Sequence, residues 1–439
     1  MARIGIRRED KNEWERRAPL TPDHVAELVE QRELEISLEP ASLRVFPAKD
    51  YRTAGARIDE TLADCRVVLG IKEVAVERLE PHKTYLYFSH TTKGQQYNMP
   101  MLSRLLELGC TLIDYEHVLD ERGRRLIFFG RYAGHAGMID TLWALGKRLA
   151  LEGQVTPFER VRLAHDYSSL DEATHHIHRI GEKLRHDGIP DGLHPLVCAF
   201  TGSGNVSRGA QEIFDRLPHV ELDPQELVRL AADREWPRNV LYRVNFNREQ
   251  RFERIEGGVL DPEELERHPQ RYRNGLAHWL PYLTMLVHGA FWKPGQPRVL
   301  SLEELRELWR AATPRLRIVT DISCDIGGGV EATVRTSTPG DPVYVYDLTR
   351  DEAKSGVGGR GPVVLAIDNL PCQLPLEASE HFADTLVRFV PALAACDWGR
   401  PFAELGLPRE LTEAVVVHRG ELTPRYAYLE GHLHTAGRS

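Results

Sequence analysis

The chain has 439 residues, which is long for a single domain and predicts two. Its 56 basic and 65 acidic residues give a net charge of −9, and the basic residues are scattered, so nucleic acid is not expected as a partner. The six cysteines form no C-x-x-C pair, the N-terminus lacks signal-peptide character, and no apolar run approaches the ~18 residues of a membrane span. We therefore expect a cytoplasmic α/β protein with free thiols and no membrane contact.

The first 133 residues are expected to form strands that alternate with helices. Thr21 followed by Pro22 is a favourable N-cap and first-turn pair for the first of these helices. Apolar runs predict strands over residues 3–7, 35–38, 67–71, 85–88, 111–113 and 126–129. This alternation favours a mainly parallel sheet, and ligands bind such sheets beyond the carboxyl ends of the strands.

Charged side chains lie next to the ends of several of these strands. They are Lys72, Glu73, His90, Glu116, Arg124 and Arg125. Cations for carboxylates, beside an acid–base pair, suit a substrate that carries several carboxylates. Each residue alone has a simpler interpretation: a solvated loop charge, a hydrogen-bonded structural histidine, or part of a hairpin turn.

The stretch from Val197 to Phe214 predicts the entrance to a dinucleotide-binding unit. An apolar strand runs into a turn, and an amphipathic helix follows. The residues of this turn and of the first helical turn are Gly202, Ser203, Gly204, Asn205, Val206 and Ser207. Glycine lets the backbone approach a pyrophosphate, and the helix N-terminus offers free N–H groups. Ser207 replaces the third glycine of G-x-G-x-x-G, so an ordinary strand-to-helix turn stays an alternative.

A second strand is expected at Val220 and Leu222. Asp223 ends it roughly 20 residues after the glycines, where a partner for a ribose hydroxyl is expected. The combination of strand, glycine turn, helix and terminal acidic residue therefore favours a nicotinamide nucleotide site.

The remaining sequence continues the α/β pattern. Strands are predicted over residues 240–244, 283–287, 316–320, 343–346 and 363–367. Long helices over 134–151 and 376–393 have the length to carry the chain between two domains, and 224–279 is the least regular part. No metal is expected, because the histidines within 175–178 have no carboxylate or cysteine partner at ligand spacing.

Several motifs occur in order along most of the chain. They are RREDKNEWERRAPL (7–20), GIKE (70–73), FSHT (88–91), LIDYE (112–116), FGRYAGHAGM (129–138), TGSGNVSRGA (201–210), DISCDIGG (321–328) and IDNLPCQLPLEASE (367–380). Together they resemble the lysine–2-oxoglutarate reductase half of the bifunctional aminoadipic semialdehyde synthases. More distantly, they are similar to fungal saccharopine dehydrogenase (lysine-forming) and alanine dehydrogenase.

The resemblance implies two Rossmann-like, doubly wound parallel-sheet domains with a cleft between them. Residues 1–134 and 372–439 would form an alanine dehydrogenase-like substrate domain, and residues 135–371 the dinucleotide-binding domain. The implied reaction condenses L-lysine with 2-oxoglutarate and reduces the imine to saccharopine. The second dehydrogenase domain of the family is missing from this sequence, so a separate saccharopine dehydrogenase is an expected partner, and a homo-oligomer stays open.

The resemblance also implies residue roles, carried over by motif. The acid–base catalytic pair is Lys72 and His90. The residues near the substrate are Arg17, Glu73, Glu116, Arg124 and Arg125. The residues around the nicotinamide are Asp321, Asp325, Asp368, Asn369 and Leu370.

Cofactor choice is left between NADH and NADPH, with a lean to NADPH. Asp223 would repel a 2′-phosphate and favour NADH. The reductase relatives are typically NADPH enzymes, and Arg208, Arg234 and Arg238 offer a phosphate partner. The arginine-rich region 234–256 departs from the family pattern.

Three functions remain open at this point. The first is the reductase that forms saccharopine. The second is the same chemistry toward lysine formation or on another amine or keto acid. The third is a nucleotide-binding protein without catalysis, and the joint presence of Lys72, His90 and the arginines argues against it.

Overall fold

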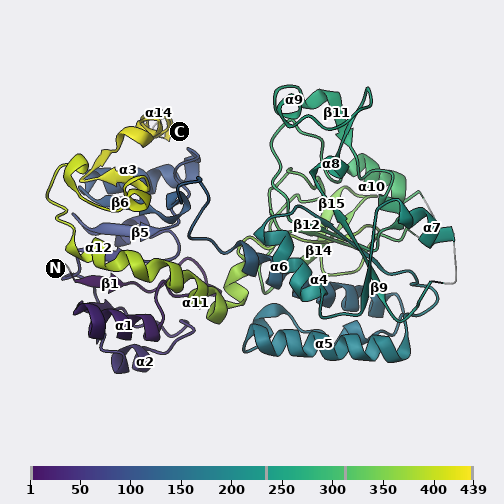
Figure 1. Ribbon diagram of the computed structural model, residues 1–439, viewed down its shortest axis with the longest axis horizontal. Helices are drawn as coiled ribbons and strands as arrows, with labels where there is room; N and C mark the ends of the chain where they lie inside the picture. The colour runs from purple at the N-terminus through teal and green to yellow at the C-terminus, as the bar shows by residue number, and fades with distance from the viewer. Residues whose placement is uncertain (1–2, 233–235, 311–313, 437–439) are drawn as a thin grey trace. The chain divides into compact units, whose positions relative to one another are not determined.

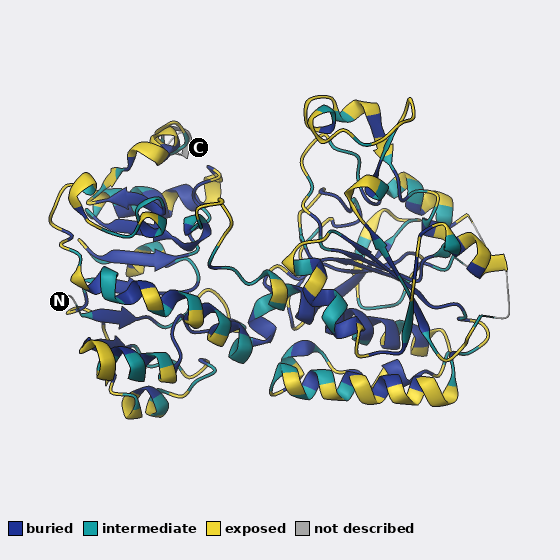
Figure 2. Ribbon diagram, in the orientation of Figure 1, coloured by how far each residue is buried: buried dark blue, intermediate teal, exposed yellow. Residues whose placement is uncertain are grey.

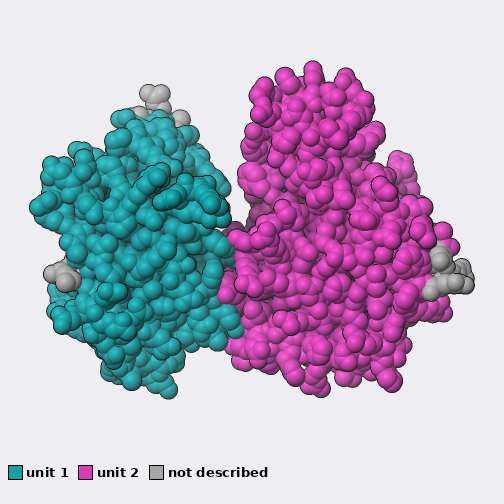
Figure 3. Space-filling model, viewed as in Figure 1, with its two compact units in different colours: residues 1–129, 375–439 teal, residues 130–374 magenta. Residues whose placement is uncertain are grey.

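The computed structural model describes residues 3–232, 236–310 and 314–436 and divides the chain into two compact units (Figures 1 and 3). Unit 1 consists of residues 1–129 and 375–439, and unit 2 of residues 130–374. Unit 1 is therefore built from two separate segments of the chain, whereas unit 2 is continuous. Among the described helices, none combines the length and apolar character that a bilayer crossing requires.

Unit 1 is organised around a mixed eight-stranded sheet in the order β18-β17-β6-β5-β4-β1-β2-β3. Its strands are β1 (Ile4–Ile6), β2 (Ile36–Leu38), β3 (Arg57–Ile58), β4 (Val67–Leu69), β5 (Thr84–Tyr87), β6 (Thr111–Asp114), β17 (Val415–His418) and β18 (Glu421–Leu422). β1 to β6 pair in parallel, and β17 joins β6 in antiparallel. The carboxyl ends of β4, β5 and β6 therefore lie at one edge of the sheet.

The helices of unit 1 come from both of its segments. They are α1 (Pro22–Arg32), α2 (Ala48–Thr53), α3 (Met99–Glu107), α11 (Pro375–Leu386), α12 (Val390–Ala395), α13 (Arg409–Thr412) and α14 (Glu430–Ala436). Phe382 of α11 packs edge-on against Tyr115, with ring centroids 5.0 Å apart, and stacks on Phe129 at 5.1 Å. The second segment thus supplies both a strand pair and part of the aromatic core of unit 1.

Unit 2 contains a second eight-stranded sheet in the order β15-β14-β16-β13-β12-β7-β9-β8. Its strands are β7 (Val197–Thr201), β8 (His219–Leu222), β9 (Leu241–Phe246), β12 (Met285–His288), β13 (Ile318–Asp321), β14 (Val343–Asp347), β15 (Glu352–Ser355) and β16 (Val363–Leu365). The strands from β8 through β16 in this order are parallel, and β14 and β15 are antiparallel additions. The central strands are buried on both faces (Figure 2).

Helices cover the sheet of unit 2, and a small hairpin projects from it (Figure 1). The helices are α4 (Gly130–Leu151), α5 (Leu170–Asp187), α6 (Asn205–Phe214), α7 (Glu226–Ala232), α8 (Arg248–Arg251), α9 (Pro262–Arg267) and α10 (Leu302–Leu308). The hairpin pairs β10 (Phe252–Arg254) with β11 (Tyr272–Asn274). Both strands of the hairpin lie within residues 224–279, the part of the sequence with the least regular pattern.

Two glycines set the close packing of α4 against α6. A Cβ atom on Gly134 would lie 2.1 Å from the carbonyl oxygen of Val206, and one on Gly209 would lie 2.1 Å from that of Arg131. Both distances are far below van der Waals contact, so a side chain at either position would force the helices apart. The N-terminal half of α6, which follows the glycine turn, is thereby fixed against α4.

Asp140 of α4 ties this helix to two loops of unit 2. Its buried carboxylate accepts hydrogen bonds from the amide of Ala164 at 2.8 Å and from Nε2 of Gln373 at 2.7 Å. Burial raises the pKa of Asp140 to about 6, against the hydrogen bonds that favour its charged form. This carboxyl group is therefore harder to ionise in the folded chain than in water.

The α/β class and the two mainly parallel sheets confirm the fold expected from the sequence, and two local expectations were wrong. Residues 126–129 form no strand, because Ile127 and Phe129 pack into the core instead of pairing with a neighbour. The expected helix over 376–393 is divided into α11 and α12 by a 3₁₀ turn at Val387–Phe389. Pro391 lies in the first turn of α12, where a proline is tolerated.

Candidate active-site residues

Lys72, Glu73 and His90 are brought together in unit 1 by adjacent parallel strands. Lys72 and Glu73 follow β4, and His90 follows β5, which pairs with β4 in register. Nδ1 of His90 lies 2.6 Å from Oε1 of Glu73, and Nζ of Lys11 donates to Oε2 of Glu73 at 2.9 Å. One carboxylate therefore links a histidine and a lysine at the carboxyl edge of the sheet.

Electrostatics distinguish the two neighbouring groups Lys72 and Glu73. Burial alone would raise the pKa of Glu73, but the hydrogen bond and charge of His90, together with the Lys11 ammonium, lower it to about 2. Burial lowers the pKa of Lys72, and the positive charge of Arg17 adds to this effect. Glu73 thus stays ionised, while Lys72 releases its proton more readily than a lysine in water.

Glu9 positions the loop that carries Lys72, and the sequence pattern gave it no role of its own. Its buried carboxylate accepts hydrogen bonds from the amides of Ile71, at 2.7 Å, and Lys72, at 3.0 Å. Burial raises the pKa of Glu9 against the charge of Arg7, which lies 3.4 Å away. The only sequence signal was the place of Arg7 and Glu9 in the motif that opens the chain.

His90 adopts a backbone conformation that side chains rarely take. Its φ is +52°, in the left-handed region, and Nδ2 of Asn98 donates to its carbonyl oxygen at 3.0 Å. Ser89, next to it, is fully buried and donates through Oγ to Asp114. A strained residue that surrounding contacts hold in place is typical of functional positions.

Arg17 lies close enough to affect Lys72, but its guanidinium is engaged within the core of unit 1. Nε and one terminal nitrogen donate to the Glu15 carboxylate at 2.7 and 2.6 Å. The same guanidinium stacks on the ring of Phe129, 4.1 Å from its centroid. Arg17 is only 2% exposed, so in this arrangement it affects Lys72 through its positive charge and is itself covered by the core of unit 1.

Glu116 and Arg125 form an ion pair, and Arg124 lies apart from them. Glu116 follows β6, and Arg125 bonds its Oε1. Burial alone would raise the pKa of Glu116, but the charge of Arg125 outweighs it and the pKa is lowered. Arg124 pairs with Asp120 in an exposed turn at 2.7 Å. Of these three candidates for substrate binding, Glu116 and Arg125 contact each other, and Arg124 is exposed to solvent.

Asp114 connects the Glu116 pair to the His90 loop. Its buried carboxylate accepts from Ser89 Oγ and from the amide of Glu116 at 2.8 Å, and burial raises its pKa to about 6. Asp114, Glu116 and His117 present possible metal-ligand atoms within 4.8 Å of one another. Their bonds to Ser89 and Arg125, and that of His117 to Thr92, account for the cluster without an ion.

The glycine turn of unit 2 has the geometry of a phosphate-binding turn. Gly202 has a φ of +91°, and a Cβ there would lie 3.0 Å from the carbonyl oxygen of Gly289. A Cβ on Gly204 would meet nothing within 4 Å, so this side of the turn is open to a ligand. Ser203 and Asn205 are exposed, Val206 is half-buried and Ser207 is buried. The N-terminus of α6 directs its free amides to the same place, as a pyrophosphate requires.

The other cofactor candidates of unit 2 lie at the same edge of the sheet. β7, β12, β13 and β16 are parallel and in register, so the residues that follow them share one edge. Those residues include Asp325 after β13, and Asp368, Asn369 and Leu370 after β16. Asp321, at the end of β13, is buried and bonded by Ser323 and Thr333, which gives it a local structural role.

Asp223 and Arg238 lie away from the positions that the sequence pattern assigned to them. Asp223 follows β8, which pairs only with β9 and is the edge strand, so β8 is not adjacent to the glycine-turn strand β7. Arg238 precedes β9 at the opposite edge and pairs with Asp191. Arg208 is exposed on α6, and Arg234 lies outside the described residues.

The two units define a class: an α/β chain with a nucleotide-type glycine turn in one unit and a lysine–glutamate–histidine cluster in the other. Its fold is similar to that of an L-alanine dehydrogenase, with a TM-score of 0.62 and 18% identity over 98% of this chain and 99% of that one. A transhydrogenase from Sinorhizobium meliloti gives a TM-score of 0.53 at 15% identity over 96% and 99%. Residues 5–136 match the N-terminal domain of alanine dehydrogenase/PNT.

Sequence comparison gives closer relatives. Over 97% of its length the chain is 34% identical to mitochondrial alpha-aminoadipic semialdehyde synthase of Rattus norvegicus and 36% identical to the synthase of Arabidopsis thaliana. It covers 47% and 41% of these proteins, less than half of their length. A lysine-forming saccharopine dehydrogenase [NAD(+)] of Emericella nidulans is 25% identical over 88% of this chain and 90% of the relative. The chain is thus related over nearly its whole length to one part of the aminoadipic semialdehyde synthases, which confirms the resemblance that its motifs predict.

Proposed function

We propose that this protein is an NAD(P)-dependent oxidoreductase acting on a CH–NH bond, which condenses L-lysine with 2-oxoglutarate and reduces the imine to saccharopine. The observation that carries the proposal is the Lys72–Glu73–His90 cluster in a chain related to aminoadipic semialdehyde synthases. The open glycine turn of unit 2 adds a fitting place for a dinucleotide. We assign the substrate domain to residues 1–134 and 372–439 and the dinucleotide domain to residues 135–371, bounds that differ by five and three residues from those of the two compact units.

The chemistry asks for groups that exchange protons at neutral pH. The neutral amine of lysine attacks the keto carbon, the carbinolamine then loses water to give the imine, and a hydride with a proton converts C=N to CH–NH. A bound nicotinamide cofactor supplies the hydride. Lys72, whose pKa is lowered, suits the role of a base that takes the proton of the amine and returns it to the departing hydroxyl.

His90 is the second proton carrier in the proposal. Glu73 fixes its Nδ1, which orients the ring and leaves Nε2 without a hydrogen bond to any described residue. A histidine held this way by a carboxylate is oriented for proton transfer through its other nitrogen. The positive charge of Arg17 helps to lower the pKa of Lys72. Glu116 follows the neighbouring strand β6 and pairs with Arg125, which would bind a substrate carboxylate.

The test is an absorbance assay at the nicotinamide band with the purified chain. We expect lysine plus 2-oxoglutarate to oxidise the reduced cofactor, and omission of either substrate to abolish the change. No oxidation of NADPH or NADH with both substrates present would reject the proposal. A panel of other amines and keto acids measured in the same way identifies a different opine-type substrate.

The similarity to lysine-forming saccharopine dehydrogenases favours a second candidate, the same chemistry run toward lysine. Saccharopine plus the oxidised cofactor tests it, and the ratio of kcat/KM in the two directions decides which candidate holds. For the compartment, we propose a reducing one, since all six cysteines are free. Curated mammalian relatives carry the word mitochondrial in their names, so the cytoplasm stays a prediction.

A further inference from the structure

In the sheet of unit 2, the strand next to β7 is β9 and not β8. The residue that follows this neighbouring strand is therefore Asn247 and not Asp223. β9 pairs with β7 in parallel, and Thr201, the last residue of β7, is in register with Phe246, the last of β9. Gly202 and Asn247 therefore leave the sheet at the same level on adjacent strands, about 5 Å apart. In dinucleotide-binding sheets, the residue after this neighbouring strand contacts the adenosine ribose.

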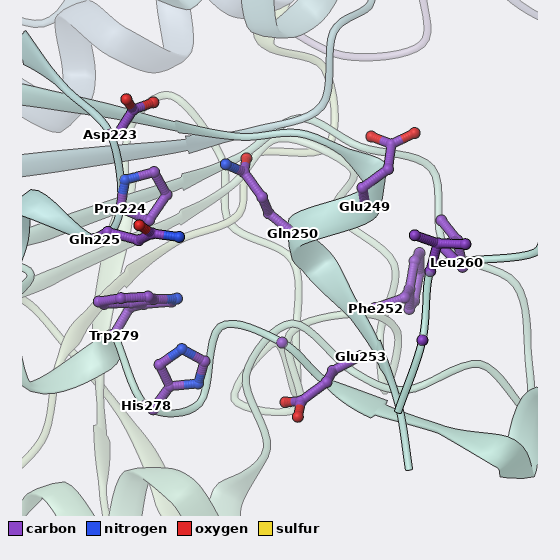
Figure 4. A pocket seen from close by; sticks show the side chains of 13 residues that line it. Asp223, Pro224, Gln225, Glu249, Gln250, Phe252, Glu253, Leu260, His278 and Trp279 are labelled. Carbon is purple, nitrogen blue, oxygen red and sulfur yellow. The ribbon is translucent and has the colours of Figure 1, made fainter. Parts of the chain in front are cut away.

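Asp223 occupies a different place. β8 is separated from β7 by β9, and its last residue, Leu222, is in register with Val244. Asp223 is therefore about 10 Å from the line of β7 and leaves the sheet two residues earlier than Phe246. It lines a cavity of about 600 Å³ together with Glu249 and Gln250 of α8 and with Trp279 (Figure 4). Asp223 therefore follows a strand that is one position further from the glycine turn than the strand that precedes α8.

The segment after β9 instead presents two arginines, with the charge of Glu266 near Arg248 and that of Glu249 near Arg251. Arg248 is exposed, and it forms no ion pair or hydrogen bond through its side chain to any described residue. Arg251, one turn later, is only 8% exposed, and its Nε is buried without a hydrogen-bond partner. A buried guanidinium that lacks a counter-ion is costly unless an anion binds it.

Charges around Arg251 agree with this interpretation. Burial, and next the positive charge of Arg248, lower the pKa of Arg251 to about 10, and the negative charge of Glu249 opposes them. The charge of Arg251 also contributes to lowering the pKa of His288, at the end of β12 on the other side of β7, after the larger effect of burial. Arg251 therefore lies near the carboxyl ends of the central strands. Glu249 lines the cavity of Asp223 (Figure 4).

We propose that Arg248, supported by Arg251, binds the 2′-phosphate of NADPH. In this proposal the adenosine ribose is contacted by the segment after β9 and not by Asp223. The inference rests on the proposed function only in requiring a dinucleotide at the glycine turn. A guanidinium matches a phosphate dianion by paired hydrogen bonds, and Arg251 adds a second positive charge behind it. The chain would accordingly prefer the 2′-phosphorylated cofactor.

The test measures binding and needs no turnover. Dissociation constants of NADPH and NADH are determined from nucleotide fluorescence for the full chain and for the variants Arg248→Ala, Arg208→Ala and Asp223→Asn. We expect the unsubstituted chain to bind NADPH more tightly than NADH. Arg248→Ala should weaken NADPH by about 10- to 100-fold and leave NADH unchanged, because only the 2′-phosphate contact is lost.

Arg208→Ala and Asp223→Asn are matched controls, since both residues are exposed and each was expected from the sequence to influence the choice of cofactor. Both should leave the NADPH-to-NADH ratio unchanged. Tighter NADH binding by the unsubstituted chain, equal weakening of both nucleotides in Arg248→Ala, or loss of the preference in a control instead would overturn the inference. If NADPH preference depends on Arg248 but lysine plus 2-oxoglutarate gives no oxidation, the inference stands and the proposed reaction fails.

Discussion

Glu73 is the residue that makes the candidate acid–base cluster a unit. It holds the His90 ring through Nδ1 and the Lys11 ammonium through its other oxygen, and its lowered pKa keeps it ionised through the neutral range. Glu9 acts indirectly, because its carboxylate binds the backbone amides of Ile71 and Lys72 and so holds the loop that carries Lys72. The orientation of the two proton carriers therefore depends on carboxylates that need not touch the substrate.

Replacement of the proton carriers tests the assignment directly. Lys72→Ala and His90→Ala should each lower kcat by about 10²–10⁴-fold, because each removes a general acid–base group from the reaction. The measurement is steady-state turnover, with circular dichroism to verify the fold. Lys183→Ala and His186→Ala, at exposed positions on α5, are the matched controls. Near-normal turnover of a folded Lys72→Ala/His90→Ala double variant would contradict the assignment.

At this scale, sequence reasoning found the residue types and missed their partners. Lys72, Glu73 and His90 could be predicted because each follows a strand, and parallel strands bring their ends together. The burial of Arg17 against Glu15 and Phe129 could not be predicted, because it depends on packing between residues far apart in sequence. The same holds for the different partners of the two adjacent arginines, Asp120 for Arg124 and Glu116 for Arg125.

The helix α4 shows how one element positions another. Its glycine Gly134 lies against the backbone of α6, where Gly209 meets α4, and its Asp140 binds two loops. α6 begins at the glycine turn, so the position of its N-terminus is set by helix packing as well as by the strand before it. A shift of α4 would therefore move the amides that are expected to bind phosphate.

The raised pKa of Asp140 predicts a pH dependence of stability. The folded chain binds this proton more tightly than the unfolded chain, so the free energy of unfolding should fall as pH rises between about 4 and 6. A change from 3.8 to about 6 corresponds to a loss of about 3 kcal/mol over this window. Urea unfolding at several pH values measures it for unit 2.

The comparison variant for this prediction is Asp140→Asn, which removes the ionisable group and keeps an acceptor oxygen. Subtracting its unfolding curve from that of the unsubstituted chain isolates the contribution of Asp140, because other buried carboxyls such as Asp114 are common to both. Asp397→Asn, at an exposed position, is the control for loss of a charge. Identical slopes for the unsubstituted chain and Asp140→Asn would contradict the prediction.

The order of strands was the part of the fold that sequence patterns did not determine. The positions of β7, β8 and β9 were predicted within one or two residues from their apolar runs. Which of β8 and β9 pairs with β7 depends on the path of the connections, and apolar periodicity carries no information about it. The ribose role of Asp223 was expected from its spacing after the glycines, and the structure places β9 instead of β8 next to β7.

At the scale of the whole chain, each hydrophobic cluster lies within a single unit. The two large clusters of unit 2 draw only on residues 136–374, and those of unit 1 combine residues from 4–127 with residues from 382–429. Unit 2 therefore has complete cores in a continuous segment of the chain. Unit 1 has no complete core in either of its segments.

This division predicts how fragments behave. Residues 130–374 expressed alone should fold, with a cooperative thermal transition by circular dichroism, because their clusters need no residue from outside. Residues 1–129 alone should fail to give such a transition, since β6 would lose β17 and Tyr115 would lose Phe382. Adding residues 375–439 through a short linker is the control that should restore it. A non-cooperative 130–374 fragment would show that the units depend on each other.

The late position of β17 in the chain has a consequence for synthesis on the ribosome. β6 is made before unit 2, and its antiparallel partner follows more than 300 residues later. At the usual rate of about 5–20 residues per second, the intervening unit 2 occupies the ribosome for roughly 10–50 s. Throughout that time the nascent chain carries an unpaired sheet edge, which is a surface that chaperones recognise and on which chains aggregate.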